Sequence, residues 1–223
     1  MTIPPTRPLH AVVFDFGDTL FTHPDGADLL VARGWTAEEA EAAIEGAWRE
    51  SKTPQAMMKN RDRDPDSHRR GWLELLQPIE DRSPGMAEVL YQKTILTPGW
   101  VPYPDTAPVL RELRRRRVPV QVLSNVAEPL TPLMERHELA GAVDGYTLSY
   151  EHAREKPDPE LFRIACRALG TDPGETLMVG DSYLADGAAA LIGMPVLLLP
   201  MVPRGAVRGL AHVLDLVSGP GAG

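Results

Sequence analysis

Short apolar runs recur along this chain and predict buried strands of a parallel sheet. Four of them are clear, at residues 11–14, 118–123, 176–179 and 195–199, and a weaker one covers residues 145–148. Segments with helical periodicity lie between them. Because strands that alternate with helices build doubly wound sheets, the pattern predicts an α/β fold with a Rossmann-like parallel sheet.

Two helices of this predicted core have clear boundaries. The segment after Asp105 reads TAPVLRELRRRR, with Leu110 and Leu113 on one face and a proline in the first turn. The second helix begins at Pro159 and ends at Gly170, a residue type that commonly follows a helix C-terminus.

Residues 21–99 interrupt the alternation, because they contain helical patterns and no strand run. Thr36 and Glu39 have the spacing of a capping box. They precede an apolar stripe at helical spacing, formed by Ala40, Ile44, Ala47 and Trp48. We therefore expect a helical cap at residues 21–99, inserted into a core formed by residues 1–20 and 100–223.

Composition narrows the possible partners and compartment. The 223 residues carry a formal net charge of -8, which disfavours nucleic-acid binding. The single cysteine, Cys166, excludes an internal disulfide and suits a reducing compartment. No apolar segment approaches the length of a membrane span, and the first residues do not read as a signal peptide. We expect a cytoplasmic protein with no membrane partner, either a monomer or a homodimer.

Polar residues follow three of the predicted strands. Asp15 ends the first strand, Ser124 and Asn125 end the second, and Asp181 follows the strand at residues 176–179. The carboxyl ends of parallel strands meet at one edge of an α/β sheet, where ligands bind. We therefore expect these side chains to form one site.

Carboxylates dominate this predicted site. Asp15, Asp181 and Asp186 would form a cluster of like charge, which is unfavourable unless a cation or protons neutralise it. A set of oxygen ligands without paired histidine or cysteine suits a hard ion such as Mg²⁺. The sequence therefore predicts a magnesium site.

The remaining polar residues suit phosphoryl transfer. Lys156 would add one positive charge, while Ser124 and Asn125 offer hydroxyl and amide donors to an anionic group. Positioning and charge neutralisation are the main tasks of a protein that transfers a phosphoryl group. Asp15 could then serve as the nucleophile that forms an aspartyl-phosphate.

The chain resembles the haloacid dehalogenase-like hydrolases over essentially its whole core. Their four motifs, in order and spacing, are similar to DFGDTL at Asp15, VQVLSN at Ser124, KPDPELF at Lys156, and GDSYLAD with Asp181 and Asp186. The resemblance implies Mg²⁺ held by Asp15, Asp181 and the backbone carbonyl of Gly17, with Asp186 in support. It also implies that Lys156 pairs with the nucleophile and with the phosphate of a small phosphorylated substrate.

One position departs from this pattern. Phosphatases of the family usually have a second aspartate, the general acid/base, where this chain has Gly17, and the acid comes one residue later as Asp18. A shift of one residue in an extended chain points a side chain to the other face, so Asp18 is not a simple substitute. Loss of a general acid typically lowers a rate by ~10² to 10⁴-fold.

Gly17 therefore leaves several hypotheses open. We predict a Mg²⁺-dependent phosphatase of a small phosphomonoester, with the proton supplied by Asp18 or solvent, or with a leaving group that needs none. A 2-haloacid dehalogenase would need no general acid, since a halide leaves unprotonated, but that branch of the family usually lacks the acid at Asp181. Two further hypotheses are hydrolysis of a C–P bond and a non-catalytic binding module.

The predicted cap carries no motif that identifies a substrate. Its arginines could meet an anionic substrate if the cap closes over the sheet; they are Arg61, Arg63, Arg69 and Arg70. His23 follows the first motif closely and is a candidate proton donor as well as an ordinary loop residue.

Overall fold

The computed structural model describes residues 8–219 and contains a five-stranded parallel sheet in the order β5-β4-β1-β6-β7. The strands are β1 (Ala11–Phe14), β4 (Val120–Ser124), β5 (Gly145–Leu148), β6 (Thr176–Gly180) and β7 (Val196–Leu198). Each predicted apolar run forms one of them, which confirms the α/β fold. The first strand lies in the middle of the sheet, between β4 and β6.

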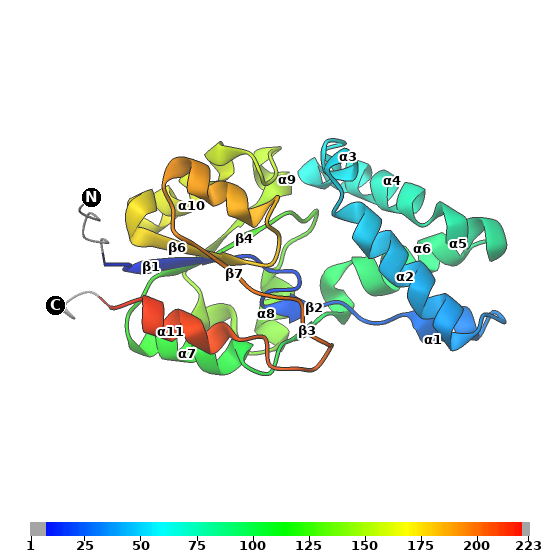
Figure 1. The fold of residues 1–223 in the computed structure, drawn as a ribbon, viewed down its shortest axis with the longest axis horizontal. Helices are drawn as coiled ribbons and strands as arrows, with labels where there is room; N and C mark the ends of the chain where they lie inside the picture. Colours follow the sequence, from blue (N-terminus) through cyan, green and yellow to red (C-terminus); the bar gives the residue numbers. More distant parts are fainter. Residues whose placement is uncertain (1–7, 220–223) are drawn as a thin grey trace, which may run out of the picture.

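Helices cover both faces of this sheet (Figure 1). On one face α10 (Pro159–Leu169) packs against Val13, and on the other α7 (Thr106–Arg115) and α11 (Val213–Leu216) pack against Val12. The alternation of neighbouring residues of β1 between the two faces follows from the period of two in a strand. Both layers are apolar at the sheet, so β1 is buried along its whole length.

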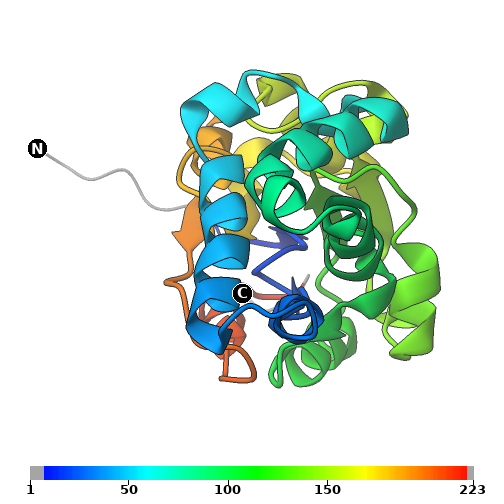
Figure 2. The same ribbon diagram turned by 90° about the vertical axis from the view of Figure 1, so that its right-hand side faces the viewer.

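The inserted segment forms a second layer of helices beside the carboxyl ends of the strands (Figures 1 and 2). Its helices surround their own apolar core, which includes Trp35, Ile44, Trp72 and Leu90. These helices are α1 (Ala27–Val31), α2 (Ala37–Ser51), α3 (Pro54–Met57), α4 (Pro65–Leu75), α5 (Gln77–Arg82) and α6 (Met86–Leu90). The structure thus has the helical cap that the fold prediction included.

A short antiparallel ribbon connects the cap to the core. β2 (Phe21–Thr22) pairs with β3 (Val101–Pro102) where the chain leaves the core and where it returns. The apolar patterns of residues 21–99 predict no strand, and β2 shows that this prediction is wrong at residues 21–22. Two residues are too few to produce an alternating pattern, so β2 depends on its pairing with β3.

The longest described helix, α2, confirms the predicted capping box. The Thr36 hydroxyl accepts from the backbone N–H of Glu39, and the Glu39 carboxylate accepts from the backbone N–H of Thr36. At the C-terminus of α10, Gly170 adopts the left-handed conformation expected of it, and Cys166 is a buried, free thiol on that helix. Within residues 8–219, no helix combines the length and the apolar character that crossing a membrane requires.

The remaining described elements are short. They are α8 (Thr131–Arg136), α9 (Ser149–His152), a π-helical turn at Tyr91–Ile95, and 3-10 turns at Arg61–Arg63, Thr97–Gly99, Ala140–Ala142, Pro173–Glu175, Asp186–Ile192 and Leu210–His212.

Candidate active site

A buried lysine joins two carboxylates at the carboxyl end of the sheet. Lys156 Nζ donates to Asp15 Oδ1 at 2.5 Å and to Asp186 Oδ1 at 2.7 Å, and its third partner is the backbone oxygen of Leu123 at 3.2 Å. The three charged side chains come from loops after three different strands, and Lys156 is only 3% exposed. An ammonium so deeply buried is stable only because it is fully paired.

Burial and neighbouring charges shift the titration of this cluster. Burial raises the pKa of Asp15 to about 7, with Asp186 and Asp181 adding to the rise and Lys156 opposing it. Burial also lowers the pKa of Lys156, but the charges of Asp15 and Asp186 outweigh it and hold that pKa above its usual range. One lysine is therefore too little positive charge for the carboxylates around it.

Asp186 is held rigidly by its own loop. It is fully buried, and its second oxygen accepts from the backbone N–H of Ser182 at 2.9 Å. A Cβ at Gly180 would overlap the Asp186 carboxylate, so only glycine fits at the end of β6. This close approach explains the glycine that begins the GDS sequence.

The carboxylates fit a divalent cation. Asp15, Asp181 and Asp186 each place one oxygen so that the three atoms lie within 4.8 Å of one another. Three convergent hard oxygens are the ligand type that Mg²⁺ prefers. Gly17, the fourth predicted ligand, lines the same cavity in the turn after Asp15.

Ser124 and Asn125 lie beside this cluster, at the end of β4. Ser124 is 4% exposed, and no described residue hydrogen-bonds to its hydroxyl. The Asn125 amide donates to the backbone oxygen of Lys156 at 3.0 Å and accepts from the Lys156 N–H at 2.7 Å. Asn125 therefore positions the loop of Lys156, while its substrate contact stays a prediction. All seven predicted site residues line one cavity.

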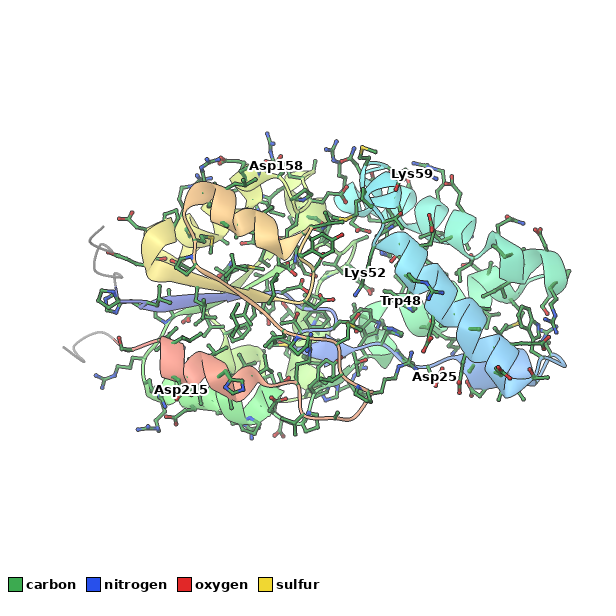
Figure 3. All side chains as sticks on the ribbon, in the orientation of Figure 1. Asp25, Trp48, Lys52, Lys59, Asp158 and Asp215 are labelled. Atoms are coloured by element: carbon green, nitrogen blue, oxygen red, sulfur yellow. The ribbon has the colours of Figure 1, made fainter. Side chains whose placement is uncertain are left out.

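A cap residue that the sequence did not indicate completes the site. Lys52, directly after α2, donates to Asp18 Oδ2 at 2.9 Å and to Asp181 Oδ2 at 2.8 Å (Figure 3). Burial lowers the pKa of Lys52, but Asp181 and Asp18 raise it above its usual range, so the side chain is an ammonium. Nothing in a cap helix sequence marks one lysine as a partner of acids so far away in the chain.

Asp18 and Gly17 explain the unusual order of the first motif. Asp18 has a positive φ of 53°, its carboxylate pairs with Lys52, and its backbone oxygen accepts from Arg208 Nε at 2.6 Å. A Cβ at Gly17 would lie 3.1 and 3.2 Å from two carbons of the Trp100 ring. The space that a side chain at position 17 needs is therefore filled by Trp100.

The cavity between core and cap has a volume of about 150 Å³. Its cap side combines apolar and polar side chains, including Trp48, Met57, Arg61, Asp62, His68, Trp72 and Ile95. Trp100 and Glu155 contribute from the core side. Side chains of the core and of the cap thus line one cavity at Asp15.

Four cap arginines were candidates for substrate contact. Of these, Arg61 is the one found among the described residues that line the cavity. Its guanidinium donates to both oxygens of Asp62, at 3.1 and 3.3 Å. Arg69 pairs with Glu88 on the surface. His23 stacks on Trp48 with ring centroids 4.1 Å apart, and burial lowers its pKa, so packing describes its role.

We predict that His68 stays neutral through the physiological pH range. Burial lowers its pKa to about 4, against the opposing charge of Asp62. The unfolded chain then binds the proton more readily, so the free energy of unfolding falls as the pH falls from about 6.5 to about 4, by at most about 3 kcal/mol. NMR titration of the imidazole checks the pKa. A midpoint near 6.5 would contradict this pKa. The free energy of unfolding of His68→Gln, measured against pH, should lose this dependence, and His212→Gln, at an exposed position, is the control.

We predict that Lys52→Met strengthens Mg²⁺ binding. Removing a positive charge 2.8 Å from Asp181 leaves the carboxylates more negative, which favours a divalent cation by about tenfold or more. Isothermal titration calorimetry without substrate measures the dissociation constant. The control is Lys59→Met, the same change at an exposed cap lysine paired with Glu74 (Figure 3). Equal or weaker Mg²⁺ binding in Lys52→Met would refute the prediction.

We predict that Gly17→Asp lowers the free energy of unfolding. The new side chain presses on the Trp100 ring, which must shift, and overpacking of this kind costs about 1–3 kcal/mol of stability. Chemical denaturation checks this in a double-mutant cycle with Trp100→Leu. The cost of the aspartate should shrink when Trp100 is absent, whereas strictly additive free energies would show that Trp100 is not the obstacle.

Comparison with known proteins agrees with this site. A family model for haloacid dehalogenase-like hydrolases matches residues 9–192. A phosphoserine phosphatase of Thermus thermophilus is 30% identical over 159 residues, which is 68% of this chain. The matched part covers 61% of the length of that relative. A phosphoglycolate phosphatase of Nitrosospira multiformis is 28% identical over 86% of this chain and 84% of its own.

Solved structures share the fold. The L-2-haloacid dehalogenase from Xanthobacter autotrophicus has a TM-score of 0.64 at 23% identity, with 93% of this chain and 88% of that chain covered. The family match includes the strands that position Asp15, Ser124 and Asp181. This chain therefore belongs to the haloacid dehalogenase-like hydrolases.

Proposed function

We propose that this chain is a Mg²⁺-dependent phosphatase that acts on small phosphomonoesters. The observation that supports this most is the convergence of Asp15, Asp181 and Asp186 around the buried ammonium of Lys156. The carboxylates suit a hard cation, and the lysine suits a phosphate dianion next to the nucleophile. The two phosphatases compared above support the same reaction class.

In the proposed reaction Asp15 attacks the phosphorus of the substrate. A bond forms between a carboxylate oxygen of Asp15 and phosphorus, and the bond from phosphorus to the leaving oxygen breaks. Lys156 and the Ser124 hydroxyl stabilise the negative charge on the phosphoryl oxygens. Bound Mg²⁺ would add charge neutralisation at those oxygens. Water then attacks phosphorus, which releases phosphate and restores the Asp15 carboxylate.

The proposed enzyme lacks a general acid at the usual position. Asp18 is paired with Lys52, and Trp100 fills the space at Gly17. Protonation of the leaving oxygen then falls to water, so alkyl phosphates should react more slowly than aryl or acyl phosphates. The missing general acid lowers the rate on alkyl phosphates by a factor of ~10² to 10⁴.

We also propose that residues 21–99 move as a cap on the ribbon of β2 and β3. Lys52 and the cavity link the cap to the core over Asp15. Opening would admit the substrate, and closure would exclude bulk water from the acyl-phosphate. We also propose a cytoplasmic location, because a single cysteine suits a reducing compartment. The protein would act there as a monomer or a homodimer.

Dehalogenation of 2-haloacids is the competing proposal, and the charge of the site argues against it. A dehalogenase needs no cation, yet Asp181 adds a third carboxylate to this cluster. A 2-haloacid also carries a carboxylate, which would meet a cavity rich in acids. Halide release that persists in EDTA would favour the dehalogenase, and phosphate release that requires Mg²⁺ would exclude it as the main activity.

We predict that the purified chain releases phosphate from acetyl phosphate and p-nitrophenyl phosphate with Mg²⁺ and not with EDTA. Asp15→Asn should lower this rate by roughly 10³-fold or more, because it removes the nucleophile. Asp215→Asn, the same change on an exposed part of α11, is the matched control (Figure 3). If no phosphomonoester is hydrolysed faster by the native chain than by Asp15→Asn, the phosphatase proposal fails.

A further inference from the structure

The cavity is lined by more acids than bases, and its bases are already paired. Among its described lining residues the carboxylates are Asp15, Asp18, Asp62, Glu155, Asp181 and Asp186, and the basic side chains are Lys52, Arg61 and Lys156. Lys156 pairs with Asp15 and Asp186, Lys52 with Asp18 and Asp181, and Arg61 with Asp62.

The histidine of the cavity adds no positive charge. Burial lowers the pKa of His68 to about 4, and its Nδ1 lies 2.9 Å from the Tyr91 hydroxyl. Lys156 is the cation that would bind the phosphate. The other basic side chains among the described lining residues are paired, so none is available to a second anionic group of the substrate. A leaving group that carries a carboxylate would therefore enter against the charge of the cavity.

Glu155, a core residue that contacts the cap, offers an unused acceptor beside this cavity. The residue is 7% exposed, and its Oε2 accepts from the backbone N–H of Asp62 at 3.0 Å. Its Oε1 is buried and has no hydrogen-bond partner within residues 8–219. Leaving a buried carboxylate oxygen without a donor is costly, and proteins rarely do so unless a ligand or water supplies the donor.

The surroundings of Glu155 make it receptive to a cation. Burial and the charge of Asp62 raise its pKa to about 7, against the backbone hydrogen bond from Asp62 and the charges of Arg61 and Arg63. A positive group beside Oε1 would relieve this by favouring the carboxylate. The indole N–H of Trp48 is a second buried atom without a partner in the described structure, so the same cavity can also hold one acceptor of a ligand.

We propose that Glu155 recognises an ammonium group on the leaving alcohol, so that among alkyl phosphates the protein prefers esters of small amino alcohols. This inference rests on the proposed phosphatase function and adds the substrate class. The volume of about 150 Å³ is close to that of a cavity that holds one benzene molecule, so a phosphate ester of a small leaving alcohol fits within it.

Four phosphate esters of one chain length test the proposal. Aminoethyl, hydroxyethyl and ethyl phosphate and phosphoglycolate end in an ammonium, a hydroxyl, a methyl and a carboxylate group. We expect kcat/KM to fall in that order, with aminoethyl phosphate about 10- to 100-fold above ethyl phosphate, the range of a charge-assisted hydrogen bond. Equal values for the four esters, or a preference for phosphoglycolate, would overturn the proposal.

A variant assigns the preference to one side chain. Glu155→Gln keeps an oxygen for the Asp62 N–H and removes the charge, so the ratio of aminoethyl to ethyl phosphate should fall by about 10- to 100-fold while ethyl phosphate is little affected. Glu151→Gln, an exposed neighbour on α9, should change neither value. A uniform loss on all four esters would mean a structural role for Glu155 and would contradict its role in recognition.

The two proposals fail in different ways. Absence of Mg²⁺-dependent turnover of any phosphomonoester, p-nitrophenyl phosphate included, would remove the phosphatase function itself. Turnover of p-nitrophenyl phosphate with no preference for the ammonium ester would leave the phosphatase in place and refute only the substrate class.

Discussion

The contact on which the rest of the site depends is the buried ion pair of Lys156 with Asp15 and Asp186. Three carboxylates so close together repel one another, and the sheet brings them together only because Lys156 and, from the cap, Lys52 supply opposite charge. Burial, with the charges of Asp186 and Asp181 added, leaves the pKa of Asp15 raised although Lys156 opposes the rise. The cost of keeping these buried carboxylates charged is the physical reason to expect a divalent cation, and it links the architecture of the sheet to phosphoryl chemistry.

The cap takes part in this balance of charge. Lys52 connects the end of α2 with Asp18 and Asp181, so the cation and the cap movement that we propose would both act on the carboxylate of Asp181. Trp100, next to the ribbon of β2 and β3, fills the space beside Gly17 and stacks on Phe16. A side chain at position 17 would therefore press against this ring.

The strands and the residues at their carboxyl ends were predictable from the sequence. The five strands were predictable because each is an apolar run between polar turns, and Asp15, Ser124 and Asp181 converge because parallel strands end at one edge. The motifs placed Lys156 and Asp186 beside them. Lys52, Trp100 and Glu155 were not predictable as members of the site, because their roles arise from contacts between the cap and the core across long stretches of chain. The ribbon of β2 and β3 was missed for the same reason, since neither strand has a pattern of its own.

Trapping the covalent intermediate is the most direct test of Asp15 as the nucleophile. Borohydride added during turnover of p-nitrophenyl phosphate reduces an aspartyl-phosphate to homoserine, which mass spectrometry of the peptide around residue 15 detects. If Asp15 is the nucleophile, homoserine forms at position 15 and depends on both substrate and Mg²⁺. Phosphate release with position 15 unmodified, or modification at a different carboxylate, would contradict the assignment of Asp15 as the nucleophile.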